Sequence, residues 1–171
     1  MNLAEDSVEL TILNDDTVLD DYGDRFGLGV EQRSIAADDD SDGIAFFLEF
    51  AFNLDPTVAE SPDYVSGQTL PNGEPFGLPN IIMETDPETG LKQMVYIFVR
   101  RNNTFPTIDY FTEVSSDARN FVVVDDADTT VTPIGNFFEE VRVVLGVLEG
   151  GSVARFVRVR VVANDPDGDG F

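Results

Sequence analysis

The chain of 171 residues contains no cysteine, no histidine and no tryptophan, and its one lysine is Lys92. Without cysteine it can form no disulfide bond, no thiolate nucleophile and no zinc-finger site. Without histidine it lacks the most common general base and the most common transition-metal ligand. Ser-His-Asp and Cys-His catalysis within the chain is therefore excluded.

Long apolar runs are also missing. No segment approaches the ~20 consecutive apolar residues that a membrane-spanning helix needs. The first ten residues, MNLAEDSVEL, have neither the basic region nor the apolar stretch that is typical of a signal peptide. We therefore expect no membrane insertion.

Acidic residues dominate what is present: 33 Asp and Glu against 10 Lys and Arg give a net charge of −23. A negative chain is a poor partner for nucleic acid, which is bound through basic patches, and for anionic membrane surfaces. The charge fits cation binding, or high salt that screens a dense acidic surface. A hydrophobic content of 42% with 14 phenylalanines nevertheless predicts a folded domain with a core.

Local patterns predict one strand, then two helices. Residues 1–16 alternate like a strand and end in an acidic turn. Residues 17–27 predict a short helix with Thr17 as its N-cap, and residues 43–54 predict a helix that is apolar on most sides. Asp55, which precedes a proline, ends that helix.

The remainder of the chain is strand-rich. Strand-like runs separated by turn sequences occur at 80–84, 92–100, 108–116, 120–126, 137–147 and 154–163. Residues 92–100 are apolar on both faces, which indicates a central strand. Residues 154–163 alternate, with Arg158 and Arg160 on one face and valines on the other. The predicted fold class is mainly β: an antiparallel β-sandwich with one or two short N-terminal helices around an EF-hand-like calcium loop.

The loop prediction rests on the sequence DDDSDGIAFFLE, residues 38–49, which has the D-x-D-x-D-G-x5-E spacing of a calcium loop. Ca²⁺ prefers six to eight oxygen ligands, and alternate residues of a tight turn can point carboxylates at one centre. Gly43 permits the sharp turn at the sixth position. The predicted ligands are the carboxylates of Asp38, Asp40, Asp42 and Glu49 and the main-chain carbonyl of Ile44.

A solvated acidic turn without an ion is the alternative, because aspartate is abundant throughout the chain. Asp39 is expected to face outward, and Phe46, at the ninth position, cannot be a ligand. Asp165, Asp167 and Asp169 repeat the alternation at the end of the chain. We interpret residues 164–171 as the start of a truncated second acidic loop; an acidic tail is the other interpretation.

The segment DDDSDGIAFFLEFAFNLDPTVAESP resembles a calcium segment, similar to thrombospondin type 3 repeats, near the C-termini of many large secreted bacterial proteins. VLDDYGDRFG resembles the short helix before that loop, and YFTEVSSDA and ARFVRVRV resemble strands of the β region that follows it. Ser41 stands where the segment usually has glycine. DSVELTILNDD resembles the last strand of a Calx-beta domain. The implied organisation is a tail of a preceding β module (1–16), a helix–calcium loop–helix segment (17–60) and a β-sandwich (61–163).

The resemblance implies a non-catalytic, calcium-binding structural or adhesive module of a larger secreted or cell-surface bacterial protein. Neighbouring modules of the same polypeptide are the expected partners, with surface glycans or proteins as further candidates. A carbohydrate-binding module is the alternative, although the chain offers no tryptophan and only four tyrosines for stacking. A carboxylate-based glycosidase using Glu113, Glu139 or Glu140 is a third hypothesis, but adjacent residues of a strand face opposite sides.

Overall fold

The computed structural model describes residues 18–59, 61–102, 107–124, 128–147 and 156–164. The strand expected within residues 1–16, the predicted N-cap Thr17 and the acidic repeat at 165–169 all lie outside the described residues.

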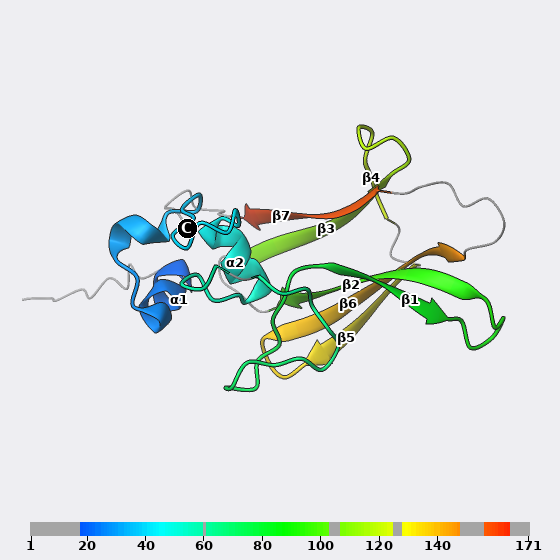
Figure 1. The fold of residues 1–171 in the computed structure, drawn as a ribbon, viewed down its shortest axis with the longest axis horizontal. Helices are drawn as coiled ribbons and strands as arrows, with labels where there is room; N and C mark the ends of the chain where they lie inside the picture. Colours follow the sequence, from blue (N-terminus) through cyan, green and yellow to red (C-terminus); the bar gives the residue numbers. More distant parts are fainter. Residues whose placement is uncertain (1–17, 60, 103–106, 125–127, 148–155, 165–171) are drawn as a thin grey trace, which may run out of the picture.

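Short helical elements come first and strands follow (Figure 1). The helical elements are α1 (Val18–Phe26), the 3-10 turn η1 (Val30–Arg33) and α2 (Phe46–Phe52). The strands are β1 (Asn80–Thr85), β2 (Lys92–Arg101), β3 (Thr107–Ser115), β4 (Val122–Val123), β5 (Thr129–Ile134), β6 (Phe138–Val147) and β7 (Phe156–Asn164). The mainly β class with short N-terminal helices is therefore confirmed. No described helix is long and apolar enough to span a membrane.

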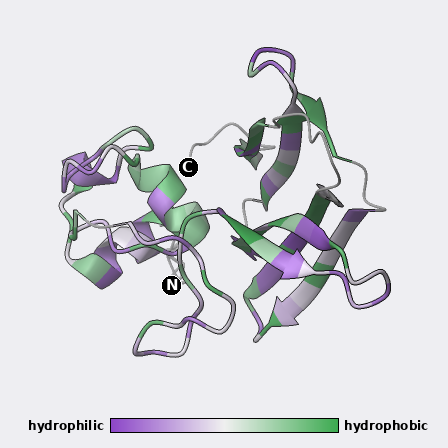
Figure 2. Cartoon of the chain, turned by 45° about the vertical axis from the view of Figure 1, so that its right-hand side comes forward, coloured by the Kyte–Doolittle hydropathy of each residue, from purple (hydrophilic) through white to green (hydrophobic). Residues whose placement is uncertain are grey.

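The strands form two antiparallel sheets. One has four strands in the order β1-β2-β6-β5, and the other has three in the order β4-β3-β7. The strand predicted to be central, β2, pairs with β1 on one side and β6 on the other, and its residues 95–99 are all buried. Hydrophobic and hydrophilic residues alternate along the strands (Figure 2), so each sheet presents an apolar face to a core.

Two apolar clusters join the helical segment to the sandwich. The buried residues of the inter-sheet cluster are Ala51, Phe52, Leu54, Tyr96, Phe98, Val141, Val143 and Leu145. As predicted, the inward-facing valines of β7 pack against this cluster. The buried residues of the helical cluster are Leu19, Tyr22, Leu28, Phe46, Phe50 and Ile108. Because α2 contributes to both clusters, it holds the helical segment against the sheets.

The other face of the four-stranded sheet is covered by the segment between α2 and β1. Tyr64 of this segment is fully buried against side chains of β2, and its hydroxyl donates to Glu140 Oε2 at 2.8 Å. Gly77 passes so close that an added Cβ would lie 2.6 Å from the Cα of Tyr64. Its φ of +132° also favours glycine. This crossing therefore has no room for a larger residue.

The largest differences from the prediction concern β5, β4 and α2. No strand is predicted at Thr129–Ile134, where β5 forms an edge strand that tolerates Pro133. Of the strand predicted at 120–126, only β4 pairs among the described residues. The helix expected from residue 43 begins at Phe46, because the backbone is still extended at its N-cap Ala45 (φ −74°, ψ 145°).

Candidate metal site

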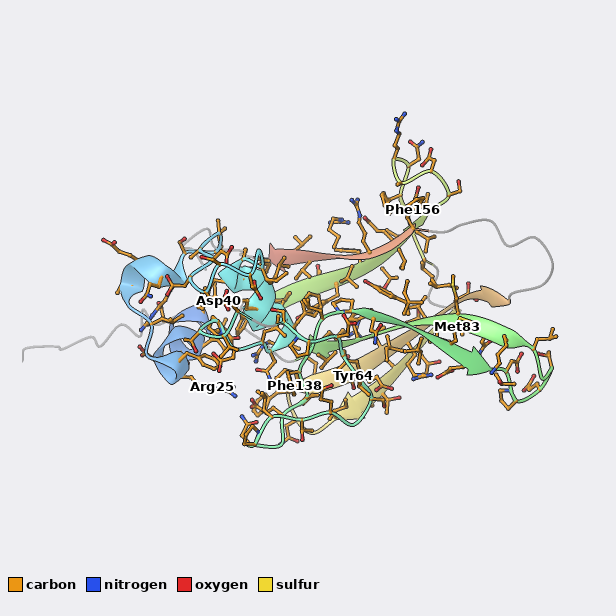
Figure 3. The ribbon with its side chains drawn as sticks, in the orientation of Figure 1. Arg25, Asp40, Tyr64, Met83, Phe138 and Phe156 are labelled. Atoms are coloured by element: carbon orange, nitrogen blue, oxygen red, sulfur yellow. The ribbon has the colours of Figure 1, made fainter. Side chains whose placement is uncertain are left out.

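The acidic loop lies between η1 and α2, at the helical end of the molecule, where Figure 3 labels Asp40. Its carboxylates shape the turn by accepting main-chain N–H groups within the loop. Asp40 Oδ1 accepts from Asp42 N at 3.1 Å, and Asp38 Oδ2 accepts from Gly43 N at 3.1 Å. Gly43 has a φ of +91°, so the sharp turn expected at the sixth position is present.

Three of the predicted ligands converge in this loop. One carboxylate oxygen from each of Asp38, Asp40 and Asp42 lies within 4.8 Å of the other two. Two oxygens on opposite sides of one Ca²⁺ are about 4.8 Å apart, because each Ca–O distance is roughly 2.4 Å. The three carboxylates are therefore close enough for one ion to contact them all. Asp39 is exposed, as expected, and accepts a hydrogen bond from Gln32 Nε2.

Glu49, the predicted twelfth-position ligand, is buried on α2 with 1% of its surface exposed. Its Oε1 has no hydrogen-bond partner. Burial, followed by the charges of Asp40, Asp42 and Asp38, raises the pKa of Glu49 to about 8. The group of three converging aspartates does not include Glu49. The structure thus places this carboxylate within electrostatic reach of the aspartates, in a position where its ionised form is costly.

Asp40 shares part of this environment. Its Oδ2 is buried without a hydrogen-bond partner, and burial together with the charges of Asp42 and Asp38 raises its pKa. Among the ion pairs of the described residues, none reaches these aspartates or Glu49. The site therefore combines converging carboxylates with unpartnered oxygens and, in the part of the chain that the structure describes, has no arginine or lysine partner. That donor set fits a hard cation such as Ca²⁺.

The remaining predicted positions have different roles. Ile44, the expected carbonyl ligand, donates its N–H to Asp42 Oδ1 at 2.7 Å, and its side chain packs against the inter-sheet cluster. The role of its carbonyl stays a prediction. Phe46 is buried in the helical cluster, so the ninth position serves packing. Ser61 donates its hydroxyl to Asp42 Oδ2. No sequence signal pointed to Ser61, because it lies outside the loop pattern.

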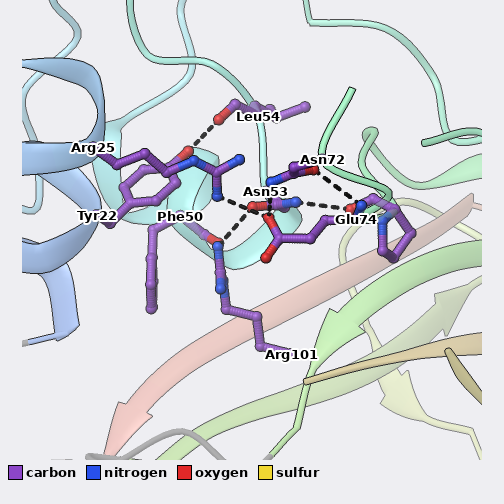
Figure 4. A network of polar contacts seen from close by, with 9 residues as sticks. Tyr22, Arg25, Phe50, Asn53, Leu54, Asn72, Glu74 and Arg101 are labelled. Atoms are coloured by element: carbon purple, nitrogen blue, oxygen red, sulfur yellow. Dashed lines mark hydrogen bonds and ion pairs between the residues drawn. The ribbon is translucent and has the colours of Figure 1, made fainter. Parts of the chain in front are cut away.

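Polar contacts anchor the C-terminal end of α2 (Figure 4). From β2, Arg101 Nε donates to Phe50 O at 2.6 Å, and its Nη2 donates to Asn53 Oδ1 at 2.9 Å. A cation at this end complements the partial negative charge of a helix C-terminus. From α1, Tyr22 donates its hydroxyl to Leu54 O. The helix that carries Glu49, the predicted twelfth-position ligand, is therefore held by both the sandwich and α1.

Each of the three acids considered for glycosidase chemistry contacts different partners. Glu139 pairs with Arg100 at 2.8 Å, whereas the next residue, Glu140, accepts the hydroxyl hydrogen bond of Tyr64. Glu113 belongs to the other sheet and lies between two arginines of β7. Each of these carboxylates is thus already paired with an arginine or a tyrosine hydroxyl.

The fold and the loop together define an acidic, mainly β protein with a three-aspartate turn beside two short helices. Comparison of the chain with models of known protein families, with characterised proteins and with solved structures finds no match. The assignment of the site therefore depends on its geometry and its donor atoms.

Proposed function

We propose that this chain is a non-catalytic, calcium-binding structural or adhesive module of a larger secreted or cell-surface protein. The observation that carries the proposal is Glu49, a buried carboxylate with an unpartnered oxygen beside three converging aspartates. A buried carboxylate is costly unless a cation or a set of donors compensates its charge. Ca²⁺ supplies that compensation and prefers the oxygen ligands that this loop offers.

Calcium would act here as a structural cross-link between the loop and α2. Its binding joins the loop to α2, whose side chains reach both the helical and the inter-sheet clusters. An ion that binds only the folded state stabilises that state by mass action. Extracellular modules use affinities on the order of 10⁻⁴–10⁻³ M, so a partly exposed site of this kind suits a location outside the cell. Neighbouring modules of the same polypeptide are the partners that such a cross-link would hold in place.

Thermal unfolding of the full chain in excess calcium and in chelator tests the proposal. At about 100 times the dissociation constant, one site contributes ~2.7 kcal/mol. For a chain of this size, that corresponds to a rise of roughly 5–10 °C in the melting midpoint. Magnesium at the same concentration is expected to give a smaller rise, because it needs shorter, near-octahedral coordination.

Two matched variants locate the effect. Asp40→Asn removes a converging carboxylate and is expected to abolish most of the calcium-dependent rise. Asp63→Asn removes an exposed carboxylate outside the loop and is expected to retain it. Identical midpoints of the unmodified chain in calcium and in chelator would contradict the proposal, as would an equal calcium response of the two variants.

A further inference from the structure

One sheet edge in the described part of the chain is both long and unpaired. The edge strands of the two sheets are β1, β5, β4 and β7. Of these, β4 has two residues, β1 has six, and β5 is interrupted by Pro133. The nine residues of β7 include neither proline nor glycine, and among the described residues they pair only with β3. Such an edge offers a row of main-chain donors and acceptors to another strand.

The side chains of β7 differ in chemistry between its two faces. The valines on the inner face are half-buried against the inter-sheet cluster. On the outer face, Arg158 Nε lies 2.8 Å and Arg160 Nε lies 2.9 Å from the carboxylate of Glu113. The two arginine side chains remain 53% and 44% exposed. Each guanidinium can therefore donate hydrogen bonds to a further anionic partner.

These two arginines share a single carboxylate and carry one more positive charge than it neutralises. Both guanidiniums are also held over aromatic rings: Arg158 lies 3.9 Å from the ring centroid of Phe121, and Arg160 lies 4.3 Å from that of Phe111. Stacking restricts a long side chain before any partner arrives, which lowers the entropic cost of binding. The outer face of β7 thus holds two oriented cations in a chain of net charge −23.

We propose that the free edge of β7 docks an extended strand of another polypeptide in which acidic and apolar residues alternate. The main chain of this strand pairs with β7, its apolar residues extend the inner row of valines, and its carboxylates lie beside Arg158 and Arg160. A second copy of the chain pairing through β7 about Val159 would place arginines opposite arginines, which is unfavourable. A polyanionic glycan would use the arginines but not the main-chain edge. The inference is independent of the metal site.

Fluorescence anisotropy with the full chain tests this inference. The probe is a short labelled peptide in which glutamate and valine alternate. One control peptide carries glutamine in place of glutamate, and another carries N-methyl groups on alternate residues, which block strand pairing. We expect saturable binding of the first peptide, binding roughly tenfold weaker for the glutamine peptide, and none for the N-methylated peptide. Hydrogen exchange is expected to slow at β7 amides when the first peptide binds.

A charge-matched pair of protein variants places the effect on β7. Arg158→Gln/Arg160→Gln is expected to weaken binding roughly tenfold, whereas Arg25→Gln/Lys92→Gln, with the same change in charge elsewhere, is expected to leave it unchanged. The loss of both arginines leaves Glu113 without partners, which could impair folding. A triple variant that also carries Glu113→Gln removes this unpaired carboxylate. Equal binding of the glutamate and glutamine peptides overturns the inference, as does binding of the N-methylated peptide. Binding of a sulfated polysaccharide without protection of β7 amides also overturns it.

Discussion

Carboxylates in the sandwich and carboxylates in the acidic loop lie in opposite environments. In the sandwich, Glu113 lies between two arginines, whose hydrogen bonds hold its pKa below its usual value. Next to the loop, at the start of α2, burial and neighbouring aspartates raise the pKa of Glu49 to about 8. The sandwich thus supplies its own cations, whereas the loop has none among the described residues. We therefore expect a proton or an ion from solution to compensate the charge there.

This contrast predicts that the two regions respond differently to calcium. Changes in the sandwich should alter stability by the same amount with and without the ion. Changes in the loop should have effects whose size or sign depends on the ion.

The largest effect is expected for Gly77→Ala, in the segment that covers the sheet. The added Cβ would meet the Tyr64 main chain at 2.6 Å, and alanine is strained at a φ of +132°. We expect a loss of roughly 2–4 kcal/mol in the free energy of unfolding, measured by chemical denaturation. The loss should be equal in calcium and in chelator. Gly67→Ala, at a φ of +82° with no atom within 4 Å of the added Cβ, should cost only about 1 kcal/mol. A loss of stability in Gly77→Ala that is smaller in calcium than in chelator would contradict the contrast between the two regions.

Glu49→Gln is expected to have the next largest effect, and its sign depends on calcium. In chelator at neutral pH, folding must either bury this charge or take up a proton, so Glu49→Gln should stabilise the chain by roughly 1–3 kcal/mol. In calcium, the variant should gain little, because it lacks one predicted ligand. The same substitution in the sandwich, Glu113→Gln, should instead destabilise the chain, since it leaves two arginines without their shared partner. Equal signs for the two variants in chelator would contradict the contrast.

The pH dependence without calcium should be opposite to that of a protein stabilised by paired carboxylates. The folded pKa of Glu49, about 8, exceeds its ordinary value of 4.5, so the folded state binds the proton more tightly. The stability gained from this proton is fully present below about pH 4.5 and is lost as the pH rises through about 8. In chelator, the free energy of unfolding should therefore increase by roughly 2–4 kcal/mol between about pH 8 and about pH 5.

Two controls isolate that dependence. Glu49→Gln should flatten it, and calcium should reverse it, because protons and calcium compete for the same carboxylate. Glu113, whose pKa is lowered, contributes stability that is present above its ordinary pKa of 4.5 and is lost only as the pH falls below that range. Glu113 therefore does not contribute to the pH dependence of stability between about pH 5 and about pH 8, which we assign to Glu49. A calcium-free chain that loses stability across this window on acidification would contradict the assignment.

The smallest expected effect is that of Ser41→Gly, within the loop itself. Ser41 has a φ of +64°, a left-handed conformation in which glycine lacks the steric penalty of other residues. We expect stabilisation by about 0.5–1 kcal/mol, measured by chemical denaturation in chelator. Ser66→Gly is the control, because Ser66 is exposed and does not have a positive φ. It should lower stability by a few tenths of a kcal/mol through the entropy of the unfolded chain.

Elements with a strong local pattern could be predicted from the sequence. The helix expected at 17–27 is observed as α1, and the apolar run at 92–100 is the interior strand β2. The strand β5 could not be predicted, because three threonines and Pro133 form a weak pattern that becomes a strand only beside β6. The start of α2 was wrong by one turn, because the hydrogen-bonded acidic loop continues to Ile44 and Ala45 is still extended.

The candidate site also has features that could be predicted from the sequence and features that could not. The convergence of Asp38, Asp40 and Asp42 followed from their spacing, since alternate residues of a tight turn point inward. Two features could not be predicted: the hydrogen bond from Ser61 to Asp42 and the burial of the Glu49 side chain. Both depend on how the segments around α2 pack together.

The sequence by itself determined the alternation of the strands, the acidic turn with its glycine, and the excess of negative charge, because these are set by residues near one another in the chain. Only the tertiary structure decided the strand order, the crossing of Gly77 over Tyr64, the sharing of Glu113 by two arginines, and the burial of Glu49 with its Oε1 unpartnered. These features require residues from separate segments to meet. The energy of a carboxylate depends on which cations, donors and water molecules the completed fold leaves within its reach.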